Sequence, residues 1–216
     1  MVEIDKNDCW QDSFGPIRFG CQLETTSLAA RGLGIRTLHQ VHEAEIIDDA
    51  QYHGGGQKGD GLVTDRMGVA LVIRTADCVP VHVHDGKRIA LVHAGWRGTA
   101  AGIVPGLADF FDMSELHAFI GPAISAARYE VDNDLYVDWL ARDPTLAPFL
   151  SQHQPGSSKR LLDLGGFIRF QLLEMGTPAE RITQIPLCTY DSKLPSYRRQ
   201  GQKAKRIQNF IYRVCP

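Results

Sequence analysis

The chain has 216 residues, of which 44% are hydrophobic, and its formal net charge is −2 at pH 7. This size and composition predict a single globular domain over residues 1–216, with a substantial core. The near-neutral charge argues against nucleic acid or an anionic membrane as a partner and favours a small-molecule substrate. No apolar run approaches the length of a membrane span and the N-terminus lacks a signal-like pattern, so we expect a cytoplasmic protein.

The cysteines give little support to a disulfide framework. Five cysteines are spread along the chain without a Cys-x-x-Cys pair: Cys9, Cys21, Cys78, Cys188 and Cys215. This spacing also argues against an all-cysteine zinc knuckle. We therefore expect most of them to be buried thiols.

The N-terminal half is predicted to consist mainly of strands. Residues 33–49 carry β-branched side chains without a helical stripe, which indicates a strand pair or one bent strand. The glycine-rich loop at 54–61 contains Gly-x-Gly-x-x-Gly, but it leads into a strand at 62–64 and does not open a helix, so we reject a dinucleotide site. The continuous apolar run at 69–73 predicts a strand covered on both faces.

An Asp-Gly pair between two apolar runs then predicts a β-hairpin. If Asp85 and Gly86 are the two central turn residues, Cys78 lies directly opposite His93. Opposed side chains of an antiparallel pair share one face, with Cβ atoms about 5 Å apart. A thiolate and an imidazole at that distance could share a metal or a proton.

A catalytic zinc site needs three protein ligands and an open fourth position, and histidine with cysteine is a frequent mixture. Cys78 and His93 supply two ligands, and we favour His42, at the end of a strand-like run, as the third. His82 and His84 share one face of the hairpin, which we expect to face solvent. The simplest alternative for the pair itself is a buried thiol beside a hydrogen-bonded core histidine.

The C-terminal half mixes helices and strands. We expect helices at 98–111, broken near Pro105, at 135–140 and at 162–175, and strands at 117–120, 183–187 and 209–214. Strands before, between and after helices indicate an α+β fold, a single domain with mixed β-sheets flanked by helices.

Charged residues and glycines flank the cysteine–histidine pair. Asp77 and Arg97 lie beside it with opposite charges, and Gly95 and Gly98 leave backbone N–H groups free near a helix start. This combination is typical of an anion site.

Several long, ordered motifs are recognisable together: Gln40-Val-His42, Thr75-Ala-Asp-Cys-Val-Pro-Val81, His93-Ala-Gly-Trp-Arg-Gly98, Ile120-Gly-Pro-Ala-Ile124, Tyr129-Glu-Val131, Cys188-Thr-Tyr190 and Ser196-Tyr-Arg-Arg199. From about residue 36 to the C-terminus the chain resembles the YfiH-type multicopper polyphenol oxidoreductase (laccase) family. The resemblance implies a layered fold like that of toxin deamidases. It also implies zinc bound by His42, Cys78 and His93, and phosphorolysis of adenosine, inosine, guanosine and methylthioadenosine together with adenosine deaminase activity.

Such a reaction assigns roles to the charged residues. We expect Arg97 and Arg199 to bind phosphate, because a guanidinium fork matches an oxyanion. Deamination also needs an acid–base partner, for which Asp77, Asp60 and Glu130 are available. We group Asp77 with the catalytic Cys78 and His93, and Asp60 with the substrate contacts.

Three other functions remain open. Cys78 activated by His93 could act without metal, as in a cysteine hydrolase or deamidase. Copper at the same site could support polyphenol oxidation, but four coppers demand several His-x-His pairs and the chain has one. A single blue-copper site requires a weak axial methionine ligand, and neither Met67 nor Met113 is obviously placed to supply it. A non-enzymatic, zinc-stabilised interaction module would fill the fourth metal position with a protein ligand.

Overall fold

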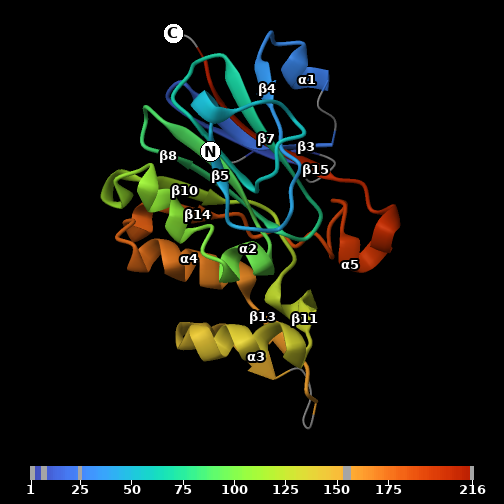
Figure 1. Cartoon of the computed structure of the whole chain (residues 1–216). Coiled ribbons are helices and arrows are strands. Elements are labelled where there is room, and N and C mark those ends of the chain that lie inside the picture. The colour runs from blue at the N-terminus through green and yellow to red at the C-terminus, as the bar shows by residue number, and fades with distance from the viewer. Residues whose placement is uncertain (1–2, 6–8, 24–25, 153–156, 215–216) are drawn as a thin grey trace.

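The computed structural model describes residues 3–5, 9–23, 26–152 and 157–214. Two six-stranded sheets lie face to face, with α2 (Trp96–Ala100) and α4 (Leu164–Glu174) on the outer side of the second sheet and the short α1 (Thr26–Ala29) beside the first (Figure 1). Cys215 lies outside the described residues, whereas the four described cysteines are free thiols, with Cys9 and Cys21 buried and Cys78 and Cys188 partly exposed.

The first sheet has the order β1-β2-β3-β15-β7-β4, in which only the β4–β7 pair is parallel. Its strands are β1 (Glu3–Ile4), β2 (Trp10–Phe14), β3 (Ile17–Gln22), β15 (Ile207–Arg213), β7 (Val69–Thr75) and β4 (Gly34–Arg36).

The second sheet has the order β14-β10-β8-β9-β6-β5, with parallel pairs at both edges. Its strands are β14 (Ile182–Gln184), β10 (His117–Ile120), β8 (Val79–His84), β9 (Ile89–Ala94), β6 (Gly61–Thr64) and β5 (Ile46–Asp48). A third, small sheet contains β11 (Glu130–Val131), β13 (Arg160–Leu162) and β12 (Leu150–Gln152).

Short helices complete the fold. The α-helices are α1 (Thr26–Ala29), α2 (Trp96–Ala100), α3 (Asn133–Arg142), α4 (Leu164–Glu174) and α5 (Tyr197–Gln200). Short 3-10 helices lie at Asp49–Gln51, Pro105–Asp109, Met113–Glu115, Ala126–Arg128, Pro144–Phe149, Ala179–Arg181 and Gly201–Lys203. Figure 1 shows α2 and α4 against the second sheet and α3 with the small sheet beyond them. In the described part of the chain, no helix combines the length and apolar character that crossing a membrane requires.

The arrangement confirms the predicted α+β fold with mixed sheets and flanking helices. The strands expected at 62–64, 69–73, 117–120 and 209–214 are present. Residues 33–49 do not form a strand pair, because β4 joins the first sheet and β5 the second. The helix expected at 98–111 is shorter than predicted, since α2 ends before a separate 3-10 turn that begins at the proline.

Two histidines of β8 are buried, although the sequence predicted that they would face solvent. His82 and His84 are both completely buried, because β8 is an interior strand and its sheet is covered on both faces. The ring nitrogens of His82 lie 3.4 and 3.3 Å from the carbonyl oxygens of Phe119 and Gly20. His84 packs among aromatic rings between the two sheets, 4.8 Å from the ring of Phe14. The prediction that these histidines face solvent is therefore wrong.

Candidate active site

The β8–β9 hairpin is present, but its register differs from the predicted one. Pro80 pairs with His93, so the loop spans residues 85–88 instead of two residues. The carboxylate of Asp85 accepts hydrogen bonds from two backbone N–H groups of this loop at 2.8 and 2.7 Å, which stabilises the longer turn. Cys78 therefore does not face His93 directly. Since the register moves by two residues, both side chains still point to the same face.

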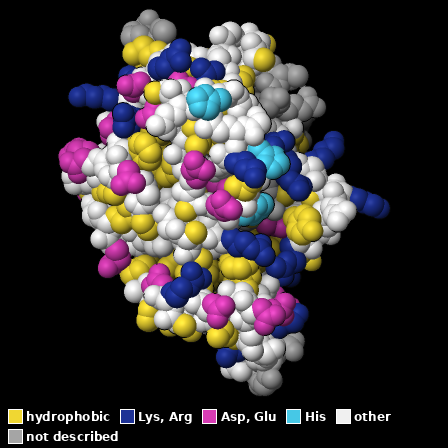
Figure 2. Space-filling model, in the orientation of Figure 1, with side chains coloured by type: hydrophobic (Ala, Val, Ile, Leu, Met, Phe, Trp, Pro, Cys, Tyr) yellow, Lys and Arg dark blue, Asp and Glu magenta, His cyan; other side chains and the backbone are white. Residues whose placement is uncertain are grey.

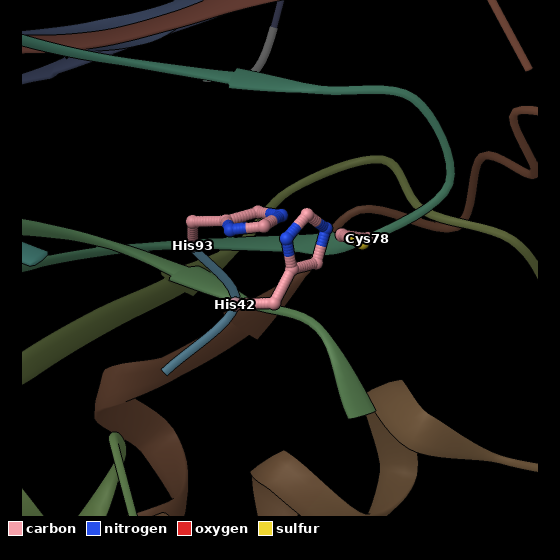
Figure 3. Close-up of side chains that lie close together, drawn as sticks. All are labelled: His42, Cys78 and His93. Carbon is pink, nitrogen blue, oxygen red and sulfur yellow. The ribbon is translucent and has the colours of Figure 1, made fainter. Parts of the chain in front are cut away.

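Chain segments at the ends of strands bring three metal-ligating side chains together. His42 follows β4, Cys78 lies between β7 and β8, and His93 belongs to β9. One donor atom from each lies within 4.8 Å of the other two, and no second group of this kind occurs among the described residues. In Figure 3 the two imidazole rings and the Cys78 side chain are turned toward one another. These are the three residues expected to bind metal.

A buried carboxylate organises this group. Asp60 is fully buried, and one of its oxygens lies 2.7 Å from Nδ1 of His93. Its other oxygen accepts hydrogen bonds from the backbone N–H groups of Val41 and Glu43 at 3.1 and 2.9 Å. These bonds flank His42, whose φ of +63° lies in the left-handed region that few non-glycine residues adopt. Asp60 therefore holds both histidines in place from behind.

The electrostatics favour a thiolate beside imidazoles. Burial would raise the pKa of Cys78, but hydrogen bonds from His42 and His93 outweigh it and lower the pKa to about 6. Burial would likewise lower the pKa of His93, but its hydrogen bonds to Asp60 and Cys78 raise the pKa to about 9. The pKa of Asp60 is lowered despite its burial, mainly because His93 donates to it. The site thus stabilises negative charge on sulfur.

Gly95 is needed because the side chains of Cys78 and His42 crowd against its backbone. A Cβ atom there would lie 3.2 Å from Sγ of Cys78 and 3.3 Å from Cδ2 of His42. Both distances are shorter than ordinary van der Waals contacts. A larger residue at this position would therefore require Cys78 or His42 to shift.

The three side chains open onto a cavity of about 610 Å³. Its lining comes from both sheets and from α4 and α5: Gln40, His42, Arg74, Thr75, Ala76, Asp77, Cys78, His93, Ile124, Tyr129, Leu164, Tyr197, Arg198 and Arg206. The cavity is open enough for a small molecule to reach the ligand group.

Asp77 lines this cavity, but its carboxylate is already engaged. It accepts hydrogen bonds from the hydroxyl of Thr189 and from the backbone N–H of Arg198, both at 2.6 Å. Its φ of +91° is also in the left-handed region. Asp77 therefore ties two distant C-terminal segments to the turn that carries Cys78.

The two arginines expected to bind phosphate lie outside the cavity lining. Arg97 is exposed, with its guanidinium 4.4 Å from the ring centre of Trp96. The helix α2 that follows Gly95 has only five residues, and Gly98 lies in it for close packing, since a Cβ atom there would meet the carbonyl oxygen of Glu43 at 2.7 Å.

Arg199 is used to hold a loop. Its guanidinium donates hydrogen bonds to four backbone carbonyl oxygens, those of Thr189, Tyr190, Ser192 and Leu194. These bonds fix residues 189–194, including the hydroxyl that contacts Asp77. The neighbouring Arg198 lines the cavity instead.

Several cavity residues were not given a role from the sequence, among them Tyr129 and Arg198. Tyr129 and Arg198 lie together, with the guanidinium 5.5 Å from the ring centre of the tyrosine. Both belong to recognised motifs, the Tyr-Glu-Val and Ser-Tyr-Arg-Arg segments, so the signal was present. The sequence did not show which residue of each motif faces the ligand group.

Comparisons with known proteins agree with the motifs. A family model described as multi-copper polyphenol oxidoreductase laccase matches residues 22–214. A purine nucleoside phosphorylase of Bacteroides thetaiotaomicron is 36% identical over 191 residues, which cover 80% of this chain and 70% of that protein. The purine nucleoside phosphorylase YlmD of Geobacillus stearothermophilus is 37% identical over 195 residues, covering 81% and 70%.

The fold is also that of a solved relative. The crystal structure of YlmD from Geobacillus stearothermophilus aligns with a TM-score of 0.83 at 27% identity and covers 99% of both chains. Sequence, family model and architecture therefore agree, and the chain belongs to the multi-copper polyphenol oxidoreductase laccase family.

Proposed function

We propose that this protein is a zinc-dependent purine nucleoside phosphorylase that also deaminates adenosine. The observation that carries the proposal is the His42–Cys78–His93 group on the wall of an open cavity, in a chain whose relatives are named purine nucleoside phosphorylases. Two imidazoles and a thiolate suit zinc, and the cavity leaves a fourth position accessible. The proposed substrates are phosphate and the nucleosides adenosine, inosine, guanosine and methylthioadenosine.

His42, Cys78 and His93 would hold the zinc, which when bound would supply Lewis-acid chemistry at a substrate or water oxygen. Asp60 accepts a hydrogen bond from Nδ1–H of His93, which leaves Nε2 free to bind the metal. We therefore assign Asp60 a positioning role, in place of the substrate contact expected from the sequence. Asp77, which is held by Thr189 and Arg198, is assigned the ordering of the cavity wall.

In phosphorolysis, a phosphate oxygen bonds to C1′ of the ribose while the bond from C1′ to the purine nitrogen breaks, and the purine leaves with a proton. In deamination, water replaces the amino group at C6 and ammonia is released. Tyr129 offers a hydrogen-bond donor for either substrate. Burial and the nearby charge of Cys78 raise the pKa of its hydroxyl well above the usual range, so the group stays protonated.

One feature favours a second candidate. Asp60, His93 and Cys78 form a connected series like the triad of a cysteine hydrolase. His42 would take no part in such a triad, yet the fold holds it in a strained conformation beside the thiolate. This favours the metal site. The rate at which an alkylating reagent modifies Cys78 separates the two functions. Bound zinc should shield the thiolate and slow the reaction. If Cys78 reacts equally fast in zinc-loaded and in chelated protein, the thiol enzyme is favoured.

The copper alternatives find less support. The single His-x-His pair, His82 and His84, is buried between the sheets, and the described residues contain one metal-ligating group only. Neither Met67 nor Met113 lines the cavity, so neither offers an axial ligand to a blue copper.

The decisive experiment supplies zinc-loaded protein with adenosine and phosphate and separates the products by chromatography. We expect adenine and ribose 1-phosphate, with inosine forming more slowly, and no adenine when phosphate is omitted. Cys78→Ala should lose both its zinc and both activities. Fully zinc-loaded wild type that releases neither adenine nor inosine would overturn the proposal in favour of the interaction module.

A further inference from the structure

The cavity carries more positive charge than the ligand group explains. Three arginines line it, Arg74, Arg198 and Arg206, whereas Asp77 is the one carboxylate among its described lining residues. Both oxygens of Asp77 already accept short hydrogen bonds from the protein. Figure 2 shows Lys and Arg side chains close to the histidines on the viewed face, with Asp and Glu side chains beside them. The cavity therefore presents a net positive surface to a ligand.

The backbone of Arg74 is hydrogen-bonded to the loop that carries His42. The side-chain amide of Gln40, which belongs to that loop, donates to the carbonyl oxygen of Arg74 and accepts from its N–H, both at 2.8 Å. On the other side β7 pairs with β15, where Ile207 is opposite Thr75. Arg74 and Arg206 flank this pair, so the pairing of the two strands keeps the two arginines close together in the cavity wall.

Arg198 approaches from α5. Its backbone N–H is held by Asp77 at 2.6 Å, and its guanidinium donates to the carbonyl oxygen of Glu130 at 2.9 Å. Its side chain is therefore anchored beside Tyr129. The guanidinium of Arg74 differs, because within the described residues it makes neither a hydrogen bond nor an ion pair. Its donors are available to a ligand.

We infer that Arg74, Arg198 and Arg206 form a subsite for a phosphate group. Guanidinium groups bind tetrahedral oxyanions through paired N–H donors. The same chemistry serves inorganic phosphate and the ester phosphate of a nucleoside 5′-phosphate. The subsite rests on the proposed function, since it places an oxyanion in the cavity assigned to the nucleoside. It takes over the role expected of Arg97 and Arg199.

The test measures binding by calorimetry, in zinc-loaded protein, of inorganic phosphate, adenosine 5′-monophosphate and adenosine separately. Arg74→Gln removes one exposed, unpaired guanidinium and should leave the fold intact. Losing a charge-assisted contact should weaken binding of the phosphate-bearing ligand about 10- to 100-fold, and Arg74→Lys should restore part of it. The matched control is Arg142→Gln on α3, whose side chain bonds its own helix at Asp138 and lies outside the cavity.

The outcomes separate the two sources of phosphate. Weakened binding of inorganic phosphate in Arg74→Gln, with adenosine unaffected, supports the subsite as the place of the co-substrate. If only adenosine 5′-monophosphate is weakened, the subsite binds the ester phosphate. If neither changes relative to Arg142→Gln, or wild type binds neither anion, the subsite is refuted.

These measurements are independent of turnover. Wild type that binds phosphate through Arg74 but never releases adenine keeps the subsite and refutes the proposed function. If Arg74→Gln phosphorolyses adenosine with the same KM for phosphate as wild type, the proposed function is kept, and the subsite is refuted as the place of the inorganic phosphate.

Discussion

Replacing Asp60 by Asn tests how the fold prepares the metal ligands. The new amide oxygen can still accept hydrogen bonds from the N–H groups of Val41 and Glu43, as the carboxylate does at 3.1 and 2.9 Å. The amide nitrogen then faces Nδ1 of His93 across the present 2.7 Å contact. Two donors cannot meet there, so Nδ1 must become the acceptor and the ring proton must move to Nε2. That is the nitrogen on which the proposed zinc binding depends.

The size of the effect follows from the burial of this contact. Loss of the carboxylate behind a ligating histidine lowers metal affinity by about 10- to 100-fold, or roughly 1.4 to 2.7 kcal/mol. Asp60 is fully buried, so water cannot replace it, and we expect a loss near the upper end of this range. Competition with a chromogenic zinc chelator at neutral pH measures the affinity, and circular dichroism verifies the fold.

Asp49→Asn is a matched control. Asp49 is also a buried carboxylate, and it pairs with Arg36 and Arg66 away from the cavity. Its replacement is expected to reduce stability without changing zinc affinity. Zinc affinity of the Asp60→Asn protein within about twofold of wild type would refute the orienting role of the carboxylate.

Two further predictions concern packing and pH. Gly95→Ala places a Cβ atom 3.2 Å from Sγ of Cys78, so we expect weaker zinc binding in the same chelator assay, and unchanged affinity would contradict the crowding argument. Burial lowers the pKa of His82 and of His84 to about 4, against about 6.5 in the unfolded chain. The unfolded chain therefore binds more protons, so the free energy of unfolding is retained above pH 6.5 and falls as the pH drops toward 4, by about 3 kcal/mol per histidine. Urea titrations at pH 7 and pH 4.5 measure this loss of unfolding free energy. The loss should be smaller in His84→Phe, which removes one of the two histidines. If the variant shows the same pH dependence as wild type, His84 does not contribute to the loss.

The sequence predicted which strands bear the site because the relevant patterns are local. The apolar run of β7 and the two apolar runs of β8 and β9 on either side of Asp85-Gly86 are visible without tertiary information. The period of two also placed Cys78 and His93 on one face despite the wrong register. The register itself failed because the side chain of Asp85 stabilises a longer loop, which the Asp-Gly pair alone does not reveal.

The sequence-based predictions that were wrong or incomplete concern features that depend on tertiary contacts. Alternation of histidine with valine on β8 indicated one polar, solvent-facing side, but packing of the first sheet buries that side. Likewise, no local pattern marks Asp60 as the partner of His93, 33 residues away. For the adjacent arginines of α5, successive helical positions differ by about 100° in direction, so one faces the cavity and the other holds the loop. Sequence alone could not say which.

The site also shows where the fold tolerates strain. Among the described non-glycine residues, His42 and Asp77 are the two with positive φ. Glycine would relieve this strain, which amounts to about 1 kcal/mol or more per residue, but would remove the imidazole and the carboxylate. Each strained residue is instead held by buried hydrogen bonds, His42 through the Asp60 contacts to its neighbours and Asp77 through Thr189 and Arg198. Because these bonds form within the protein itself, folding sets the positions of the ligand loop and of the Cys78 turn before any metal binds.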